Sequence, residues 1–362
     1  MSIKVTRASL PSFGEFCEEI RPLWDSHILT NMGPLHQRFA AALREYLGCA
    51  GITLFSHGHS ALEAALRALR LPAGSRIITT PFTFASTVHA ISRLGFEPVF
   101  CDVLPSDGTL DPSRLEGLID SRTSAVLPVH VYGNACDADA IGAMASRHGL
   151  KVVYDAAHAF GVRLDGAPLV CRGDASVLSF HATKVFNTVE GGAVCFTDGS
   201  LRQALDDEKN FGIRDEVTCA AAGGNAKMNE LQAAMGLCNL RHIDDELHER
   251  ERLDAVYRRM LAGAVDFFEV RSGATRNHSY MPVLLRDGAQ RDAVYDALLA
   301  AGVNARKYFW PLVCDAEPYR GLPADVPVAR GLSERVLALP LYPGLPEEEV
   351  VRIGECCKKT VA

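Results

Sequence analysis

The sequence predicts an α/β fold, with a large domain built on a mostly parallel sheet and a smaller α+β domain at the C-terminus. A chain of 362 residues exceeds what one hydrophobic core usually supports. Short apolar runs alternate with helical patterns through the first two thirds of the chain, which is typical of a parallel sheet covered by helices. This alternation ends near Asp245. We therefore expect a large domain at 1–244 and a small domain at 245–362.

The composition is that of a globular protein, with 48% hydrophobic and 22% charged residues. No apolar run reaches the ~18 residues of a membrane span, and Met1–Ala8 lacks the apolar stretch of a signal peptide. The 11 cysteines include no C-x-x-C pair, which favours reduced thiols over a disulfide framework or a zinc site. We expect a cytoplasmic protein without a metal or membrane anchor. The net charge of −7 argues against nucleic acid as a partner.

The elements of the large domain follow from apolar periodicity and from glycine and proline breaks. After a mixed segment up to residue 34, apolar residues from Leu35 to Leu47 predict one helix that ends at Gly48. A substrate-facing loop is expected at 211–224. The expected strands are 52–55, 76–80, 97–102, 124–132, 151–155, 175–180 and 191–196, and the further helices are 61–69, 81–94, 110–119, 137–148 and 200–210.

The small domain has strands and helices without the earlier alternation. It is expected to open with a long charged helix at 248–260. The remaining elements are strands at 266–270 and 280–285 and helices at 290–301 and 347–358.

A single lysine stands in the segment that follows the strand 175–180. Lys184 has small and apolar neighbours, and the segment closes with Glu190-Gly-Gly. A lysine amine in such surroundings can attack a carbonyl and form a Schiff base. Most lysines lie on the surface, so an exposed loop lysine is the alternative.

The strand 151–155 ends in Asp155, and two alanines and His158 follow. In an open α/β sheet, the carboxyl ends of the strands face the ligand crevice. A buried carboxylate at that place needs a cationic partner. A protonated pyridine nitrogen is such a partner, and a lysine Schiff base with an aspartate at this nitrogen is how pyridoxal 5'-phosphate is held. The alternative for Asp155 is a helix cap.

The segments DAAHAFG (155–161) and SFHATKVFNTVEGG (179–192) resemble the DegT/DnrJ/EryC1/StrS sugar-nucleotide aminotransferases, and the resemblance extends from Leu29 to Pro343. It implies the aspartate-aminotransferase-like fold (PLP fold type I), pyridoxal phosphate as cofactor and Lys184 as the catalytic residue. Within the family, the chain is most similar to enzymes that aminate C4 of a dTDP-4-keto-6-deoxyhexose. The implied reaction moves an amino group from L-glutamate to this ketone.

The cofactor phosphate is expected where the strand 52–55 passes into a helix through His57, Gly58, His59 and Ser60. Free N–H groups and the helix dipole favour an anion there; alternatively, Ser60 caps the helix. The family usually has Ser-Gly-Thr at 57–59, so the role of the His59 side chain is open. The resemblance also places the Ser179 hydroxyl on the phosphate, although a buried structural serine is the alternative.

Three further side chains are expected around the cofactor ring. Phe82 and Phe84 are both candidates for stacking on the ring or for the core, and the resemblance favours Phe84. His158 matches the position that bonds the phenolic oxygen of the cofactor, with a structural histidine as the alternative. Asp155 is expected at the ring nitrogen.

The resemblance implies a homodimer with shared active sites. Asn225 lies in a segment, Gly223–Gly236, that resembles the family's dimer-crossing segment, and it would reach the partner's cofactor phosphate; alternatively, it caps the next helix. Asn31 and Gly33 stand in a turn-rich loop that is either a connector or a border of the sugar-nucleotide site. Arg306 and Tyr308 are expected substrate contacts, with a solvated loop as the alternative.

Other functions are weighed against these residues. Dehydratases of the same fold carry histidine in place of the lysine, so Lys184 argues against them. C3-specific sugar aminotransferases more often carry glutamine where His158 stands. A regulatory protein that binds the cofactor without turnover is a third alternative, although no DNA-binding appendage is evident. Asn277-His-Ser279 fits the N-glycosylation pattern, but a cytoplasmic protein is not glycosylated at such a site.

Overall fold

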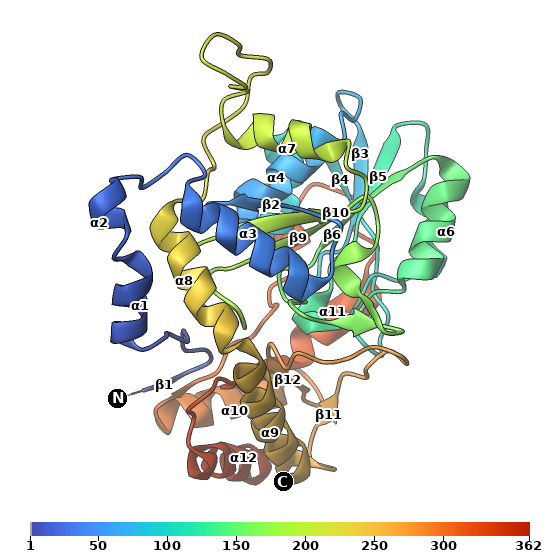
Figure 1. Cartoon of the computed structure of the whole chain (residues 1–362). Coiled ribbons are helices and arrows are strands. Elements are labelled where there is room, and N and C mark those ends of the chain that lie inside the picture. Colours follow the sequence, from blue (N-terminus) through green and yellow to red (C-terminus); the bar gives the residue numbers. More distant parts are fainter. Residues whose placement is uncertain (1) are drawn as a thin grey trace.

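A seven-stranded sheet forms the centre of the computed structural model, which describes residues 2–362 (Figure 1). β10 runs antiparallel to both of its neighbours, whereas the other neighbouring strands are parallel. The predicted mostly parallel sheet is therefore confirmed. In spatial order its strands are β2 (Gly51–Phe55), β10 (Gly192–Phe196), β9 (Ala175–Ser179), β6 (Lys151–Asp155), β5 (Thr123–Leu127), β3 (Arg76–Thr79) and β4 (Glu97–Phe100).

Helices cover both faces of this sheet because successive side chains of each strand point to opposite sides. In β10, Ala193 and Cys195 pack into the core beneath α3 and α8, while Val194 and Phe196 pack beneath α4 and α7. α5 shares the second face, and α6 packs in a further core cluster with Val126 of β5. These helices are α3 (Pro34–Leu47), α4 (Gly58–Ala68), α5 (Ala85–Arg93), α6 (Ala138–His148), α7 (Leu201–Lys209) and α8 (Glu230–Arg241).

The C-terminal part is built on a three-stranded antiparallel sheet of order β11-β12-β14. A parallel pair, β1 with β13, joins the N-terminal segment to this part. The division at 244/245 stays a prediction. The elements are β1 (Ile3–Lys4), α9 (Ile243–Leu261), β11 (Asp266–Phe267), β12 (Met281–Leu284), α10 (Gly288–Ala300), β13 (Val303–Asn304), α11 (Pro327–Arg335), β14 (Val336–Leu339) and α12 (Glu347–Val361).

The remaining elements lie at the edges of the molecule. α1 (Phe13–Ile20) contacts α8, and the short α2 (Leu23–Ser26) follows it. β7 (Arg163–Leu164) and β8 (Ala167–Pro168) form a small hairpin. None of the helices within residues 2–362 has the length and apolarity that a membrane crossing requires.

One buried aromatic cluster connects the two parts of the chain. Phe82, which precedes α5, is 0% exposed and packs edge-on against both Tyr132 and Phe309, with ring centroids 6.0 Å apart in each pair. Phe82 is therefore a core residue, whereas Phe84 is 53% exposed. The cluster fixes the loop that carries Phe309 against the carboxyl ends of the central strands.

The predicted helix at 110–119 is wrong. The segment forms two 3-10 turns, Pro112–Arg114 and Glu116–Leu118. Pro112 lacks the N–H that a helix interior needs, and Gly117 disfavours helix. Asp111 caps the first turn by accepting a hydrogen bond from the Ser113 N–H.

Several boundaries also differ from the prediction. The strand expected at 124–132 ends at Leu127, because the chain turns at Val131–Gly133, where Tyr132 has a φ of 56°. The strand at 266–270 ends at Phe267, and the helix expected from 81 begins at Ala85. The elements that were not predicted are β1, α1, α2, β7, β8, β13, α11 and β14. The sequence has no glycine or proline between α11 and β14, so the usual signal of a boundary between two elements is absent.

The loop expected at 211–224 is confirmed as a loop, whereas its facing the substrate stays a prediction. An isolated bridge pairs Ile213 with Cys219, and no helix or strand forms between α7 and α8. Figure 1 shows this loop extending away from the body of the molecule beside α7.

Candidate active site

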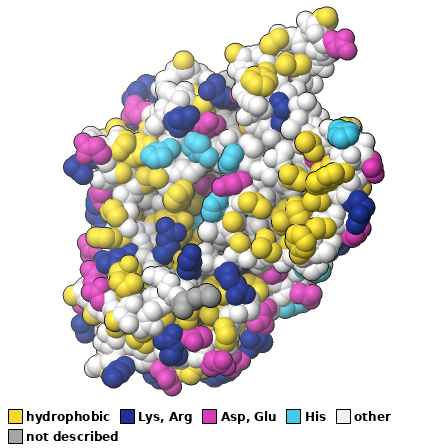
Figure 2. All heavy atoms as spheres, turned by 90° about the vertical axis from the view of Figure 1, so that its left-hand side faces the viewer, with side chains coloured by type: hydrophobic (Ala, Val, Ile, Leu, Met, Phe, Trp, Pro, Cys, Tyr) yellow, Lys and Arg dark blue, Asp and Glu magenta, His cyan; other side chains and the backbone are white. Residues whose placement is uncertain are grey.

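A cavity of about 320 Å³, called the first cavity, opens at the carboxyl ends of β6 and β9. Ligand sites of open α/β sheets are found at this edge. Figure 2 shows histidine, lysine and arginine side chains around a hollow on one face of the molecule. The first cavity brings together nine of the predicted residues: Gly58, His59, Phe84, Asp155, His158, Ser179, Lys184, Arg306 and Tyr308.

Asp155 ends β6 and is 8% exposed. Its Oδ2 accepts a hydrogen bond of 2.7 Å from the Thr87 hydroxyl, and its Oδ1 accepts one of 3.0 Å from the Ala157 N–H. No helix follows Asp155, so the helix-cap alternative is wrong. Within residues 2–362 the carboxylate has no ion pair, and it lines the first cavity, where it can receive a cation.

His158 presents a neutral ring to the same cavity. Burial, together with the charge of nearby Lys184, holds the pKa of His158 well below its ordinary range. Its Nδ1 accepts a hydrogen bond of 3.1 Å from the Tyr132 N–H. Since the neutral ring carries one proton and Nδ1 accepts, the proton is on Nε2, which can donate to a ligand oxygen.

The first turn of α4 forms an anion site. The N-cap residue is His57, and no side chain caps the helix, so the first N–H groups of the helix remain free. A Cβ on Gly58 would lie 2.8 Å from the Ser179 Cβ, and a Cβ on Gly192 would lie 2.7 Å from the Gly58 N. Only glycine fits at these two positions, and the backbone thereby stays accessible to a phosphate.

The Ser60 side chain does not cap α4, because the helix begins at Gly58 and Ser60 lies within its first turn. The His59 ring is held by its neighbours: Nδ1 bonds to the Ser86 hydroxyl at 2.8 Å, and Nε2 lies 3.4 Å from Glu63. His59 lines the first cavity together with Ser179.

Lys184 lies in the loop after β9, in a turn closed by a hydrogen bond of 2.8 Å from its own N–H to the His181 carbonyl. The side chain lines the first cavity, and within residues 2–362 its Nζ has no hydrogen-bond or ion-pair partner. The alternative of a surface lysine without a role therefore finds no support in this placement. An amine and a carboxylate that both lack an ion pair within residues 2–362 therefore line one cavity.

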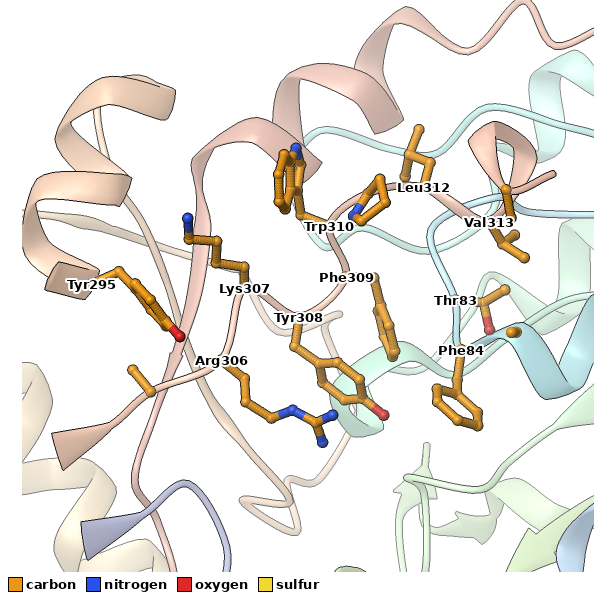
Figure 3. A pocket seen from close by; sticks show the side chains of 14 residues that line it. Thr83, Phe84, Tyr295, Arg306, Lys307, Tyr308, Phe309, Trp310, Leu312 and Val313 are labelled. Atoms are coloured by element: carbon orange, nitrogen blue, oxygen red, sulfur yellow. The ribbon is translucent and has the colours of Figure 1, made fainter. Parts of the chain in front are cut away.

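Phe84 is the N-cap residue of α5, and its exposed ring lines the first cavity. Arg306 and Tyr308 lie on the loop after β13, with the Arg306 guanidinium 5.0 Å from the Tyr308 ring centroid. Figure 3 shows the Arg306 and Tyr308 side chains extending side by side toward Phe84, whereas Lys307 and Trp310 extend the opposite way.

This loop also borders a second cavity of about 580 Å³, shown in Figure 3. The two cavities share four lining residues, so they adjoin. The four shared residues are Thr83, Phe84, Arg306 and Tyr308.

Besides Ser60, which does not line the first cavity, three predicted residues lie outside it. Asn225 is exposed and pairs with Asn210 in an isolated bridge. The cap of α8 is Asn229, whose side chain accepts a hydrogen bond from the Gln232 N–H, so the alternative that Asn225 caps this helix is wrong. Asn31 is exposed in the loop before α3.

Gly33, the third of these residues, is the N-cap of α3. The buried Glu230 carboxylate occupies this helix end, because it accepts hydrogen bonds of 2.7 and 3.1 Å from the N–H groups of Leu35 and His36. This N-terminus is thus already satisfied by an acidic side chain.

Sequence reasoning missed the residues that hold Asp155 and His158 in place. Besides Thr87, these are Asn277 and Ser279, whose side chains donate hydrogen bonds of 2.8 and 2.9 Å to the His158 carbonyl. The Asn277 side chain also donates to the Phe160 carbonyl at 3.0 Å. Asn277 is 2% exposed, so the glycosylation pattern noted in the sequence is a buried structural contact.

The described part of the chain, residues 2–362, contains no group of three or more metal-ligating side chains placed to hold a metal ion. The fold, with a lysine and a carboxylate that line one cavity at the edge of its sheet, defines the class of aminotransferases with the aspartate-aminotransferase fold.

Comparisons with known proteins give the family. The chain belongs to the DegT/DnrJ/EryC1/StrS aminotransferase family, whose model matches residues 13–358. It is 40% identical over 362 residues to a dTDP-4-amino-4,6-dideoxy-D-glucose transaminase of Escherichia coli, covering 97% of each chain. A relative of the same name from Shigella dysenteriae is 40% identical over 352 residues, covering 96% of this chain and 95% of the relative.

A solved structure also resembles this chain over nearly its whole length. The crystal structure of DesI in the presence of its TDP-sugar product superposes with a TM-score of 0.94 at 35% identity, covering 99% of this chain and 93% of DesI. The predicted fold class and family are confirmed by these findings.

Proposed function

We propose that this protein is a pyridoxal-phosphate-dependent sugar-nucleotide transaminase. It moves an amino group from L-glutamate to the C4 ketone of a nucleotide-linked 4-keto-6-deoxyhexose, with dTDP-4-keto-6-deoxyglucose as the substrate. The observation that carries the proposal is the first cavity, which is lined by the Lys184 amine and the Asp155 carboxylate, neither of which has an ion-pair partner among the described residues. The relatives named for C4 amination of the dTDP sugar support the choice of substrate.

The residues present fit the cofactor. Gly58 and Gly192 leave the first turn of α4 open to the phosphate. The exposed Phe84 ring offers a face on which a flat ring can stack. When bound, pyridoxal phosphate supplies an aldehyde that accepts and returns an amino group, and a ring that delocalises the electrons of the reacting carbon.

The chain's own groups perform the remaining work. The Lys184 Nζ would hold the cofactor and, when free, would move a proton to and from the reacting carbon. The Asp155 carboxylate, fixed by Thr87 and Ala157, would keep the proton on the ring nitrogen. The His158 Nε2–H would donate to the phenolic oxygen. Ser179 and the first N–H groups of α4 would bind the phosphate, with His59 beside them.

The sugar nucleotide is proposed to enter past Arg306 and Tyr308 and to extend into the second cavity. Arg306 suits a diphosphate because a guanidinium binds phosphate oxygens in pairs. Tyr308 and Phe84 flank the passage between the two cavities.

We further propose a homodimer with shared active sites. Apolar side chains are exposed on the N-terminal segment and on the loop 211–224, and Figure 2 shows such side chains gathered on this face of the molecule. Asn225, Asn31 and Gly33 lie outside the first cavity of their own chain and are proposed to face the partner's cavity. The exposed side chains are Leu10, Phe13, Trp24, Ile28, Leu29, Phe211, Ile213 and Val217.

The division into domains at 244/245 and a cytoplasmic location complete the proposal. All 11 cysteines are free, which supports a reducing compartment. The three-stranded sheet and the helices α10 and α12 form a core of their own with α9, which supports the division.

The reaction is tested by incubating the protein with dTDP-4-keto-6-deoxyglucose and L-glutamate and by locating the new nitrogen with NMR. An amino group at C4 supports the proposal, whereas one at C3 favours the C3-specific alternative. Glutamate alone should shift the cofactor absorbance from the aldehyde to the amine form. A protein that binds the cofactor without this shift is the regulatory alternative.

The shared site is tested by mixing two inactive variants, Lys184→Ala and Asn225→Ala. If Asn225 serves the partner's site, a mixed dimer contains one site with both residues intact, and mixing restores part of the activity. Absence of recovery in mixed dimers that have been isolated and verified contradicts the shared site.

A further inference from the structure

Arg306 is a cation without a partner at the border of the two cavities. Within residues 2–362 its guanidinium has no ion pair and no hydrogen bond, although it lines both cavities. The neighbouring cations have a partner: Lys307 and Arg291 share the Asp292 carboxylate, at 2.6 and 2.5 Å. Of these three cations, only Arg306 lacks an ion-pair partner within residues 2–362.

The backbone of Arg306 is held by two hydrogen bonds to β14. Its backbone N–H donates to the Ala338 carbonyl at 3.0 Å, and its carbonyl accepts from the Ala338 N–H at 2.8 Å. These bonds tie the loop to β14 in the small sheet. The guanidinium lies over the Tyr308 ring and extends toward Phe84, which lines both cavities (Figure 3). Because the backbone is held, anion binding has to order only the Arg306 side chain.

The reaction brings two different anions to this place, one after the other. The amino donor carries a carboxylate at the end opposite its reacting carbon, and the sugar nucleotide carries a diphosphate on the far side of the sugar. Both substrates react at the same cofactor atom, so each extends from the first cavity toward its border. Carboxylate and phosphate are the two groups that a guanidinium binds with paired hydrogen bonds.

Resting on the proposed function, we propose that Arg306 is a shared substrate-binding residue. It binds the distal carboxylate of the amino donor in the first stage and the diphosphate of the sugar nucleotide in the second. The two substrates therefore exclude one another by competing for one cation. This arrangement also selects for donors with a second carboxylate over monocarboxylic amino acids.

The test compares the parent protein with Arg306→Gln in two measurements on the cofactor-loaded protein. Calorimetric titration with dTDP gives the dissociation constant of the nucleotide, and the cofactor absorbance gives the glutamate concentration that half-converts the protein. Loss of paired, charge-assisted hydrogen bonds is expected to raise both values about tenfold or more. In the parent, dTDP should raise the required glutamate concentration competitively.

Two further variants complete the design. Arg320→Gln makes the same change at an exposed arginine that lines neither cavity, and it should leave both values within about twofold. Arg306→Lys keeps the charge but loses the paired geometry, so both values should lie between those of the parent and the glutamine variant. It also serves as the test variant if Arg306→Gln does not fold.

An Arg306→Gln protein in which either value stays within twofold of the parent overturns the shared role. Failure of the proposed function looks different, because the parent itself would then show no absorbance change with glutamate. The dTDP titration of parent and variant remains informative in that case, since an unchanged dissociation constant still overturns the inference.

Discussion

Asn277→Ala should destabilise the protein through the backbone around His158. The Asn277 amide donates to the carbonyls of His158 and Phe160, and its Oδ1 accepts from the Ser279 N–H at 3.2 Å. All three bonds are buried, so water cannot replace them.

The magnitude follows from the groups that the substitution leaves without a partner. The His158 carbonyl keeps its hydrogen bond of 2.9 Å from the Ser279 hydroxyl, whereas the Phe160 carbonyl and the Ser279 N–H lose the bonds that Asn277 makes. A buried polar group left unsatisfied costs about 1–3 kcal/mol. Two such groups predict a loss of about 2–6 kcal/mol in the free energy of unfolding.

Urea unfolding followed by circular dichroism measures this loss, with Asn304→Ala as the control. The Asn304 side chain makes no hydrogen bond within residues 2–362, so its removal should change stability by less than about 0.5 kcal/mol. The Asn277 variant should also retain less cofactor after dialysis, because the His158 ring loses its position. If the Asn277 variant were as stable as the control, this account of the Asn277 hydrogen bonds would be refuted.

Three more predictions follow from the site and the core. Asp155→Ala removes the partner of the ring nitrogen, so cofactor retained after dialysis should fall at least about tenfold; retention equal to the parent's would contradict this role. Gly58→Ala places a Cβ 2.8 Å from the Ser179 Cβ. The first turn of α4 must shift to relieve this contact, so cofactor binding should weaken in the same assay. Binding as tight as the parent's would show that the anion site tolerates a side chain at this position. Burial lowers the pKa of His36 from 6.5 to about 4. As the pH falls, His36 is therefore protonated in the unfolded chain before it is protonated in the folded chain. The free energy of unfolding should fall by about 1.4 kcal/mol for each pH unit below 6.5 until about pH 4. His36→Leu should flatten this dependence in urea titrations at several pH values, and an unchanged slope would rule out the His36 contribution.

The strands of the central sheet could be predicted because each is a short apolar run with a clear break beside it. β6 ends at Asp155 and β2 at the His57-Gly58 turn, and both signals are local. The segment that carries Lys184 could be found for the same reason. Its unusual composition is continuous in the chain.

The contacts that position the site could not be predicted. Thr87 and Asp155 are 68 residues apart, and Asn277 and His158 are 119 apart. A threonine in a helix or an asparagine in a loop has the same local sequence whether or not it meets such a partner. Only the packing of α5 and of the segment before β12 against the sheet brings these groups together.

Helix caps show a second limit. Asn225 and Ser60 are both residue types that favour caps, but Asn229 and His57 hold those positions. Asn229 forms a complete capping box with Gln232, which outweighs the composition of the earlier segment.

The central claim is that the Lys184 amine holds pyridoxal phosphate. Borohydride reduction of the purified protein with the cofactor, followed by mass spectrometry of its peptides, tests this directly. The account predicts one phosphopyridoxyl group per chain, on the peptide that contains Lys184. A label on another lysine, or a protein that borohydride leaves unlabelled, would contradict it.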